Sequence, residues 1–462
     1  MSRIPVRLKF LGGARTVTGS KSLIQVEKQN VLVDCGMFQG RKELRLRNWE
    51  APEFDPAKLD AVVITHAHLD HSGYLPALIK RGFRGNIYCT YSTKELMELV
   101  LLDAAHLQEE EARYANKWGT SKHNHAEPLF NVKEARAVLQ HVKCIPFNKP
   151  TDITKNFTVT ATPVGHILGA SAMSIDTHNR RITFSGDVGS YDIPILRDPQ
   201  PVEFGDLVLC ESTYGDRRHT KDNLLEDTAN LIKKALMTGG PIIIPSFAIG
   251  RAQLILYYIA KLERKGMLPI IPVYVDSPMA SSCYDIYRKH TEEYNDETLK
   301  RLKEREVPMM TAKTSFCKSR ESSKKLNYMQ GSRIIISASG MLTGGRVLHH
   351  AMNWLPNKDA TFIFAGYQAE ETRGRQIVNG AKSIKIFGQN IPVCAHIEQF
   401  KGFSAHADRD ELIKWLASSG TTPGELKIVH GEGSIEDSFC EHVKNTLGWK
   451  ASVAEPEEEV EL

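Results

Sequence analysis

The sequence predicts an α/β protein built from at least two domains. Its 462 residues exceed the length of one ordinary domain. Residues 6–210 contain many short apolar or alternating runs separated by polar or glycine-bearing turns, a pattern typical of strands. From residue 222, helical and strand patterns alternate, which indicates a parallel sheet flanked by helices. Strand-like alternation returns near residue 384, so we expect the chain to re-enter its first domain there.

The composition is that of a globular protein, with 41% hydrophobic and 25% charged residues. No membrane-length apolar stretch and no signal-peptide core is present, so we expect a cytoplasmic protein with no membrane partner. The eight cysteines form no C-x-x-C pair, which argues against a thiolate zinc site and a disulfide framework. A net charge of +4 permits an anionic substrate without requiring one.

The elements of the first part can be taken in order. Strands are expected at 6–11, 22–26, 30–34, 61–64, 85–90, 157–163, 172–176, 181–184 and 207–210. A helix is expected from 72 to 80, and a longer one, rich in Glu and Ala, from 92 to about 116. The last strand of the chain is expected at 426–429.

The turns of the second part are candidate binding loops. Strands expected at 241–245, 269–275 and 333–338 alternate with helices at 223–237, 251–265 and 279–290. In α/β sheets, ligands bind at the carboxyl ends of the strands, where helix N-termini can hold anions. The candidate substrate-binding residues there, including one from the polar run that follows, are Ser246, Arg251, Gly344, Gly345, Arg346 and Arg375. Each arginine could clamp a phosphate or form a structural ion pair.

One short stretch concentrates potential metal ligands. His66, His68, Asp70 and His71 fall within six residues, directly after the apolar run 61–64. Burying so many titratable groups without partners is unfavourable, and bound metal would offset that cost.

Three further candidates follow other predicted strands. His166 is flanked by glycines, Asp187 ends a hairpin, and His430 ends the last strand. Nitrogen and carboxylate ligands without cysteine suit zinc, with manganese as the harder alternative. Seven ligands are too many for one tetrahedral zinc but suit two metals that share a carboxylate. Two metals about 3.5–4 Å apart stabilise the attacking and leaving oxygens of a displacement.

These motifs resemble those of a known fold. The stretch His66-Ala67-His68-Leu69-Asp70-His71 matches the H-x-H-x-D-H motif of the metallo-β-lactamase fold. Asp34, His166 and Asp187 match the first, third and fourth motifs of that fold in order. H-x-H-x-D-H alone would leave many hydrolases as candidates.

The later motifs narrow the resemblance. Glu211, His406 and His430 match the three additional motifs of the β-CASP branch, and the chain is similar to its compact bacterial ribonucleases, relatives of RNase J and the pre-mRNA 3′-end cleavage endonuclease. The resemblance implies a four-layer αββα metallo-β-lactamase domain with an inserted parallel-sheet β-CASP domain. It implies boundaries of 1–211 and 381–454 for the first domain and 212–380 for the insert. The acidic tail 455–462 is expected to be disordered.

The resemblance also assigns roles. It implies one zinc held by His66, His68 and His166, a second held by Asp70, His71 and His430, and Asp187 bridging both. Asp34 would orient the histidine turn without touching metal. Asp70, Glu211 and His406 are the implied catalytic residues. His406, supported by Glu211, would contact the scissile phosphate and protonate the leaving 3′-oxygen, since the pKa of histidine lies near neutral pH.

The implied function is zinc-dependent hydrolysis of single-stranded RNA by a metal-bridging hydroxide. We expect endonucleolytic cleavage that leaves 5′-phosphate and 3′-hydroxyl ends, by a homodimer. His430 favours RNA, because DNA-repair members of the family have valine at that motif. The alternatives are a 5′–3′ exoribonuclease, a small-molecule thioester or lactam hydrolase, and an inactive RNA-binding subunit.

One position departs from the family pattern. Branch members commonly read G-Y-Q-A-x-G-T-x-G-R, and Glu371 stands where the second glycine is usual within residues 366–375. The departure concerns local RNA contacts rather than the metal ligands.

Overall fold

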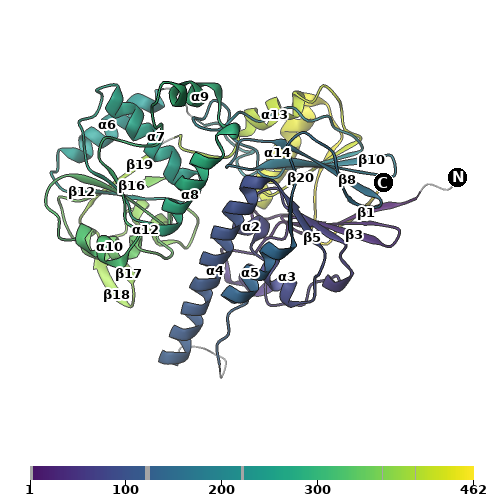
Figure 1. Cartoon of the computed structure of the whole chain (residues 1–462), viewed down its shortest axis with the longest axis horizontal. Helices are drawn as coiled ribbons and strands as arrows, with labels where there is room; N and C mark the ends of the chain where they lie inside the picture. The colour runs from purple at the N-terminus through teal and green to yellow at the C-terminus, as the bar shows by residue number, and fades with distance from the viewer. Residues whose placement is uncertain (1–3, 120–124, 220–222, 367, 401) are drawn as a thin grey trace. The chain divides into compact units, whose positions relative to one another are not determined.

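The computed structural model describes residues 4–119, 125–219, 223–366, 368–400 and 402–462 (Figure 1). Within these ranges the chain forms two compact units. The first unit contains residues up to 192, residues 197–218 and residues 406–462. The second contains residues 193–196 and 219–405.

The first unit is built on two mixed seven-stranded sheets. In spatial order, the first sheet consists of β22 (Glu459–Glu461), β1 (Val6–Gly12), β2 (Lys21–Val26), β3 (Gln29–Val33), β4 (Ala61–Val63), β5 (Asn86–Cys89) and β6 (Val142–Cys144). The second consists of β21 (Ala451–Val453), β20 (Glu425–Val429), β11 (Leu207–Glu211), β10 (Arg180–Phe184), β9 (Ser171–Thr177), β8 (Phe157–Pro163) and β7 (Thr151–Thr154). In each sheet, four neighbouring strands are parallel and the remaining pairings are antiparallel.

The two sheets pack face to face around one hydrophobic core. Val33 and Val63 of the first sheet belong to the same buried cluster as Ile182 and Leu209 of the second. Helices cover the outer faces (Figure 1). On the first sheet they are α2 (Leu69–Ser72), α3 (Leu75–Lys80), α4 (Tyr91–Trp118) and α5 (Val132–His141); on the second they are α13 (Arg409–Ala417) and α14 (Gly433–Leu447). The short helix α1 (Lys42–Arg47) follows β3 in the chain and buries none of its own residues. The predicted four-layer αββα arrangement is confirmed.

The second unit contains the predicted parallel sheet. Its strands, in spatial order, are β14 (Thr314–Phe316), β13 (Val273–Val275), β15 (Arg333–Ser337), β12 (Pro241–Pro245), β16 (Thr361–Ala365) and β19 (His396–Phe400). β12, β15 and β16 are buried along their whole length, as expected for parallel strands covered on both faces. The helices are α6 (Leu224–Leu236), α7 (Arg251–Arg264), α8 (Pro278–Lys289), α9 (Asp296–Lys303), α10 (Arg320–Leu326), α11 (Val347–Trp354) and α12 (Arg373–Val378).

The chain returns to the first unit later than the sequence predicts. Two expected strands form the separate hairpin of β17 (Ser383–Ile386) and β18 (Gln389–Pro392). β19 then pairs with β16 in the parallel sheet, so residues 381–405 belong to the second unit. Alternation along a strand identifies its buried face but not its partner, which explains the difference.

The expectation of a disordered tail is wrong. Residues 459–461 form β22, which pairs antiparallel with β1. Val460 and Leu462 pack against the core between the sheets, and Leu462 N donates to Val6 O at 2.9 Å. The acidic side chains are tolerated because an edge strand leaves them in solvent, where Glu461 pairs with Arg7.

Two further observations concern helix length and the cysteines in the described residues. No helix there is long and apolar enough to cross a membrane. All eight cysteines are free thiols, and six of them are buried.

The backbone conformation at position 371 explains why glycine is usual there in the family. Glu371 has a φ of +64°, a left-handed conformation that glycine adopts without the steric cost of a β-carbon. Tyr367 of the same stretch lies outside the described residues.

We therefore expect Glu371→Gly to raise the free energy of unfolding by about 1 kcal/mol, because it removes the left-handed penalty. Denaturant titration measures the change. Glu371→Ala is the matched control, since it removes the carboxylate but keeps the β-carbon. Equal stabilisation by both variants would mean that the charge, not the backbone conformation, is responsible.

Candidate metal centre

The site residues follow the ends of strands in both sheets of the first unit. Asp34 follows β3, and the turn 64–72 that carries four candidates follows β4. Asp187 follows β10, and His430 follows β20. Because neighbouring parallel strands end at the same edge of a sheet, these side chains meet. The seven metal-ligand candidates fall into two groups in which all ligand atoms are mutually close.

The first group contains three histidines and one carboxylate oxygen. His68 Nδ1 lies 3.2 Å from both His66 Nε2 and His166 Nε2. Asp187 Oδ2 lies 3.3 Å from His66 Nε2 and 3.5 Å from His166 Nε2. Ligands bound at about 2.0–2.1 Å to a tetrahedral zinc would be about 3.3–3.4 Å apart. The spacing of these four atoms therefore fits one zinc ion.

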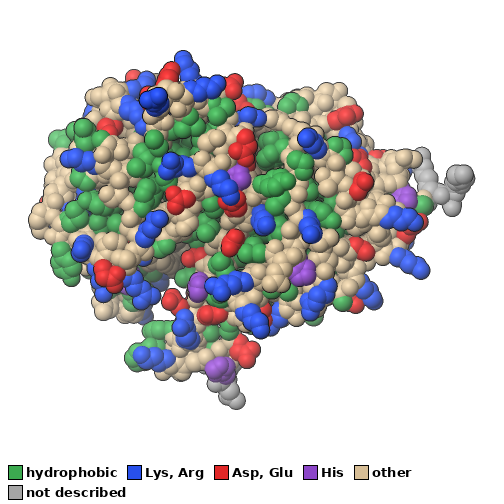
Figure 2. Space-filling model, in the orientation of Figure 1, with side chains coloured by type: hydrophobic (Ala, Val, Ile, Leu, Met, Phe, Trp, Pro, Cys, Tyr) green, Lys and Arg blue, Asp and Glu red, His purple; other side chains and the backbone are tan. Residues whose placement is uncertain are grey.

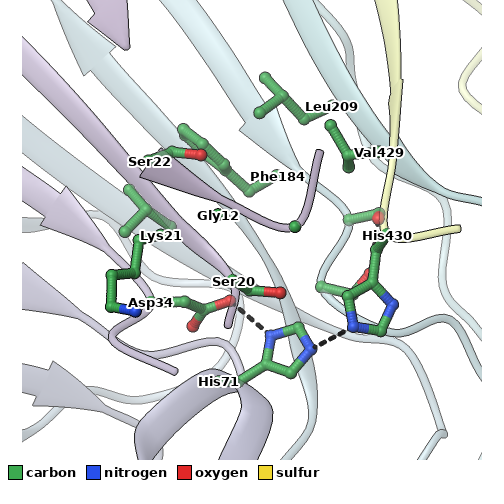
Figure 3. Close-up of a pocket in the computed structure, with 14 residues that line it drawn as sticks. Gly12, Ser20, Lys21, Ser22, Asp34, His71, Phe184, Leu209, Val429 and His430 are labelled. Atoms are coloured by element: carbon green, nitrogen blue, oxygen red, sulfur yellow. Dashed lines mark hydrogen bonds and ion pairs between the residues drawn. The ribbon is translucent and has the colours of Figure 1, made fainter. Parts of the chain in front are cut away.

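The second group shares Asp187 with the first. His71 Nε2 lies 3.2 Å from His430 Nε2 (Figure 3). The same nitrogen lies 3.2 Å from Asp187 Oδ1. Asp70 Oδ2 lies 3.6 Å from His430 Nε2. The two oxygens of Asp187 thus face different groups, as a carboxylate between two cations requires.

The chemistry of this donor set also fits divalent metal. Asp187 Oδ1 is buried and accepts no hydrogen bond within the described residues. An unsatisfied buried carboxylate oxygen is energetically unfavourable, and a bound cation would remove that cost. Burial lowers the pKa of His66, of His166 and, to about 3, of His68. These imidazoles are therefore neutral at pH 7 and can donate lone pairs to a metal.

Asp34 supports the second group from outside. Its Oδ2 accepts a hydrogen bond from His71 Nδ1 at 2.7 Å, which leaves Nε2 as the ligand nitrogen (Figure 3). Thr65 donates both its backbone amide, at 2.8 Å, and its hydroxyl, at 2.9 Å, to the same carboxylate. Burial alone would lower the pKa of His71, but Asp187 and Asp34 raise it well above its usual value.

Glu211 and His406 form a pair next to the first group. His406 Nδ1 lies 3.2 Å from Glu211 Oε1, and the imidazole rings of His406 and His166 have centroids 4.4 Å apart. The amides of Val188 and Thr213 donate to Glu211 and hold its carboxylate in place. The backbone of His406 forms an isolated antiparallel β-bridge with Gly189, which lies two residues after Asp187 in the sequence. This bridge holds His406 beside the segment that carries Asp187.

The charge of Glu211 determines the protonation state of His406. Burial alone would lower the pKa of this histidine, but the charge and hydrogen bond of Glu211, together with Asp187 and Asp70, raise the pKa to about 9. His406 is therefore protonated at pH 7 and can act as an acid. Bound cations would cancel the part that comes from Asp187 and Asp70 but not the contact with Glu211.

The six candidate substrate-binding residues all lie in the second unit. Arg346 is committed to a structural role. Its Nη1 donates to Asp276 at 2.8 Å and to Cys317 O at 2.7 Å, and its Nη2 donates to Lys318 O. Asp276 is fully buried and also accepts from His350 at 2.7 Å. Of the two roles considered for Arg346, the structure supports the ion pair.

Some backbone amides of the neighbouring glycine loop are used within the loop itself. The amide of Gly344 donates to Ser339 Oγ at 3.2 Å, and Gly345 has a φ of +78° that glycine permits. Ser246 is buried, and its hydroxyl donates to Phe247 O. Arg251 is the first residue of α7, and Arg375 is exposed on α12.

The sequence gives no signal for one supporting residue, Glu436. This buried glutamate of α14 accepts hydrogen bonds from the amides of Arg15 and Gly431, both at 3.2 Å. It thereby ties the loop of His430, whose backbone has a φ of +52°, to the loop after β1. Burial raises the pKa of Glu436 to about 8.

A small cavity lies behind His71 and His430, with a volume of about 40 Å³ (Figure 3). Asp34 and the segment 20–22 also line it. Lys21 is buried there with its Nζ 4.5 Å from the centre of the Phe38 ring, and burial lowers the pKa of Lys21 to about 8.

Comparison with protein families supports the domain organisation. Residues 16–225 match the metallo-β-lactamase superfamily, and residues 252–377 match the β-CASP domain. Residues 390–454 match the Zn-dependent metallo-hydrolase RNA specificity domain.

Two relatives and one solved structure extend the comparison. The chain is 34% identical to ribonuclease TTHA0252 of Thermus thermophilus, over 92% of this chain and 93% of that protein. It is 30% identical to transcription termination factor FttA of Methanocaldococcus jannaschii, over 95% of this chain and 69% of that protein. The crystal structure of a protein of unknown function from Enterococcus faecalis matches the fold with a TM-score of 0.60 and 15% identity, covering 99% of this chain and all of that one.

Because burial raises the pKa of Glu436, this residue should make stability depend on pH. The folded protein binds the proton of Glu436 more tightly than the unfolded chain, so its contribution is complete below about pH 4.3 and is lost as pH rises through about 8. We expect wild-type stability to fall by up to about 1.4 kcal/mol per pH unit, relative to Glu436→Gln, across that range.

Denaturant titrations of both proteins at pH 6 and pH 9 measure this difference. The glutamine is the matched variant, because it keeps the shape and cannot ionise. Parallel stability curves for the two proteins would show that Glu436 is ionised in the folded state and would contradict the prediction.

Proposed function

Because the chain belongs to the β-CASP branch of the metallo-β-lactamase superfamily, a family of metal-dependent hydrolases, we propose that it is a zinc-dependent ribonuclease. Its substrate is single-stranded RNA, which it cleaves endonucleolytically to leave 5′-phosphate and 3′-hydroxyl ends. The observation that carries the proposal is the position of Asp187, with one oxygen facing each of two histidine-rich groups. The cofactor follows from that arrangement, and the choice of substrate follows from the relatives.

The cofactor we propose is a pair of zinc ions. His66, His68 and His166 would hold one ion, Asp70, His71 and His430 the other, and Asp187 both. Two such ions lower the pKa of bound water towards 7 and neutralise charge on a phosphate. Asp34 keeps the His71 ring in the orientation and tautomer that a ligand needs. Manganese remains the alternative for the same oxygen and nitrogen donors.

The proton needed by the leaving group comes from His406. Hydrolysis breaks the bond between phosphorus and the 3′-oxygen, and that oxygen must gain a proton to leave as a hydroxyl. Glu211 binds Nδ1 of the imidazole, so Nε2 is the nitrogen that donates. After the transfer, the neutral imidazole keeps its orientation through Glu211.

The choice of RNA is supported by the relatives. Ribonuclease TTHA0252 is named for action on RNA, and residues 390–454 match a domain described by RNA specificity. His430 lies in that segment and is one of the proposed ligands. We also propose that the protein acts as a homodimer.

Metal content and RNA cleavage should therefore depend on the same residues. We expect the purified protein to contain about two zinc ions per chain and to cut end-labelled single-stranded RNA into internal fragments. Chelation should abolish cleavage, and zinc should restore it. His68→Ala and Asp187→Asn should each lose zinc, measured by mass spectrometry of the metal, and lose cleavage with it.

His106→Ala is the matched control, because that histidine is exposed on α4, and it should retain both properties. Release of mononucleotides from the 5′ end would show that the protein is an exonuclease and not an endonuclease. Zinc-loaded protein that leaves RNA intact but hydrolyses a thioester or lactam would refute the proposal.

His406→Ala should reduce RNA cleavage by about 10²–10⁴-fold without loss of zinc, because general acid catalysis contributes about that factor. A diester with a p-nitrophenolate leaving group needs no proton, so its hydrolysis should fall far less. Equal losses for both substrates would exclude the acid role.

Glu211→Gln should change the pH profile. Cleavage requires protonated His406 and therefore declines as pH rises through its pKa. Removing the carboxylate that raises this pKa should move the decline to lower pH. If the pH profile of the variant coincides with that of the wild type, Glu211 does not control the proton transfer, and the prediction is wrong.

A further inference from the structure

The charge of the whole chain does not explain how it would hold RNA. The net charge is only +4, and Figure 2 shows Lys and Arg side chains interspersed with Asp and Glu side chains on the visible face. Nucleic-acid affinity comes from local contacts between cations and phosphates and from aromatic stacking. A local group of exposed cations and aromatic side chains is therefore the feature of interest.

Helix α1 of the first unit carries such a group. The positions of Lys42, Arg45, Leu46 and Trp49 correspond to i, i+3, i+4 and i+7, which places these residues on one face of the helix. The turn continues to Trp49, whose amide donates to Leu46 O at 3.0 Å. All four side chains are exposed, Leu46 by 52% and Trp49 by 53%. This face combines two cations with two large apolar side chains.

The helix is held in place without burying any residue of its own. The Asn48 side chain accepts from Phe38 N at 2.9 Å and donates to Phe38 O at 2.8 Å. The Arg47 guanidinium lies 4.3 Å from the centre of the Phe38 ring. These contacts use the opposite side of the helix. The exposed face is thus a fixed surface rather than a loose segment.

The same segment is tied to the proposed metal ligands. Met37 N donates to Leu69 O at 2.8 Å, next to Asp70, and Cys35 N donates to His71 O at 2.7 Å. Lys42 follows Met37 by five residues, a span of at most about 18 Å. The face therefore begins within a few nucleotides of the metal centre.

We propose that the exposed face of α1 binds single-stranded RNA beside the metal centre. Lys42 and Arg45 contact backbone phosphates, and Trp49 stacks on a base. This subsite rests on the proposed function, because it gives the RNA strand a path to the ligand turn. The pairing of cations with an exposed indole fits a polyanion that carries flat rings.

The tip of α4 offers a useful contrast. It exposes Trp118 by 62%, close to the cations Arg113 and Lys117, but Glu109, Glu110 and Glu111 precede these cations on the same helix. Three carboxylates thus outnumber two cations there and repel phosphate, whereas residues 41–50 carry four cations against Glu43 and Glu50. The α4 tip is therefore a matched surface with the same residue types and no expected RNA contact.

The test measures binding of a fluorescein-labelled single-stranded RNA with phosphorothioate linkages, by anisotropy, to the full-length zinc-loaded protein. Trp49→Ala should weaken binding by about fivefold or more. The double variant Lys42→Ala/Arg45→Ala should also bind more weakly, and its plot of log affinity against log salt should flatten by about 1.4. Trp118→Ala and Arg113→Ala/Lys117→Ala should match the wild type. Zinc content and thermal midpoint confirm that each variant is folded.

The outcomes separate this inference from the proposed function. Wild-type affinity in both α1 variants, with cleavage of RNA by the wild type, overturns the subsite and leaves the ribonuclease intact. Loss of affinity in the α1 variants of a protein that never cleaves RNA supports the subsite and refutes the ribonuclease. Equal losses in the α4 variants overturn the subsite. A change in molar mass of Trp49→Ala with unchanged RNA affinity identifies a contact between copies and also overturns it.

Discussion

The buried carboxylate of Asp187 is the constraint on which much of the first unit depends. It lies among five histidines. Oδ1 approaches His71 and His430, and Oδ2 approaches His66, His166 and, at 4.0 Å, His406. Without a cation, one oxygen has no hydrogen-bond donor within the described residues. Such a group is stable only if both sheets keep their ends aligned, because its neighbours come from strands of both. The packing of apolar residues between the sheets maintains this alignment.

The backbone around the centre is correspondingly specialised. Asp34 and His430 both have left-handed conformations that are costly for residues with a β-carbon. Each is held by hydrogen bonds with another segment. Thr65 N donates to the Asp34 carboxylate, and His430 N donates to Gly13 O at 2.6 Å. Glu436 adds a second tie to the same two loops. The strain is tolerated because several segments fix it together.

The clustering of the proposed ligands could be predicted from the sequence better than the residues that support them. Four of them fall within one short stretch, and three follow recognisable strands, so both their chemistry and their position at strand ends could be inferred. The four are His66, His68, Asp70 and His71, and the three are His166, Asp187 and His430. Thr65 and Glu436 act through hydrogen bonds between distant segments, which leave no local pattern. The same limit explains the errors at β19 and β22, whose partners are set by tertiary pairing. It also explains why the sequence left the role of Arg346 open, because its carboxylate partner Asp276 lies seventy positions earlier.

The order of the elements along the chain has a consequence for biosynthesis. β20, β21 and β22, together with His406 and His430, all follow the second unit in sequence. A ribosome therefore completes the parallel-sheet unit while the first unit still lacks three strands and His430, one of the proposed ligands of its candidate metal centre. The strand edges of the nascent N-terminal segment therefore stay unpaired until translation ends. Metal binding before translation ends is thereby restricted to the four histidines and two aspartates of the proposed ligand set that are already synthesised.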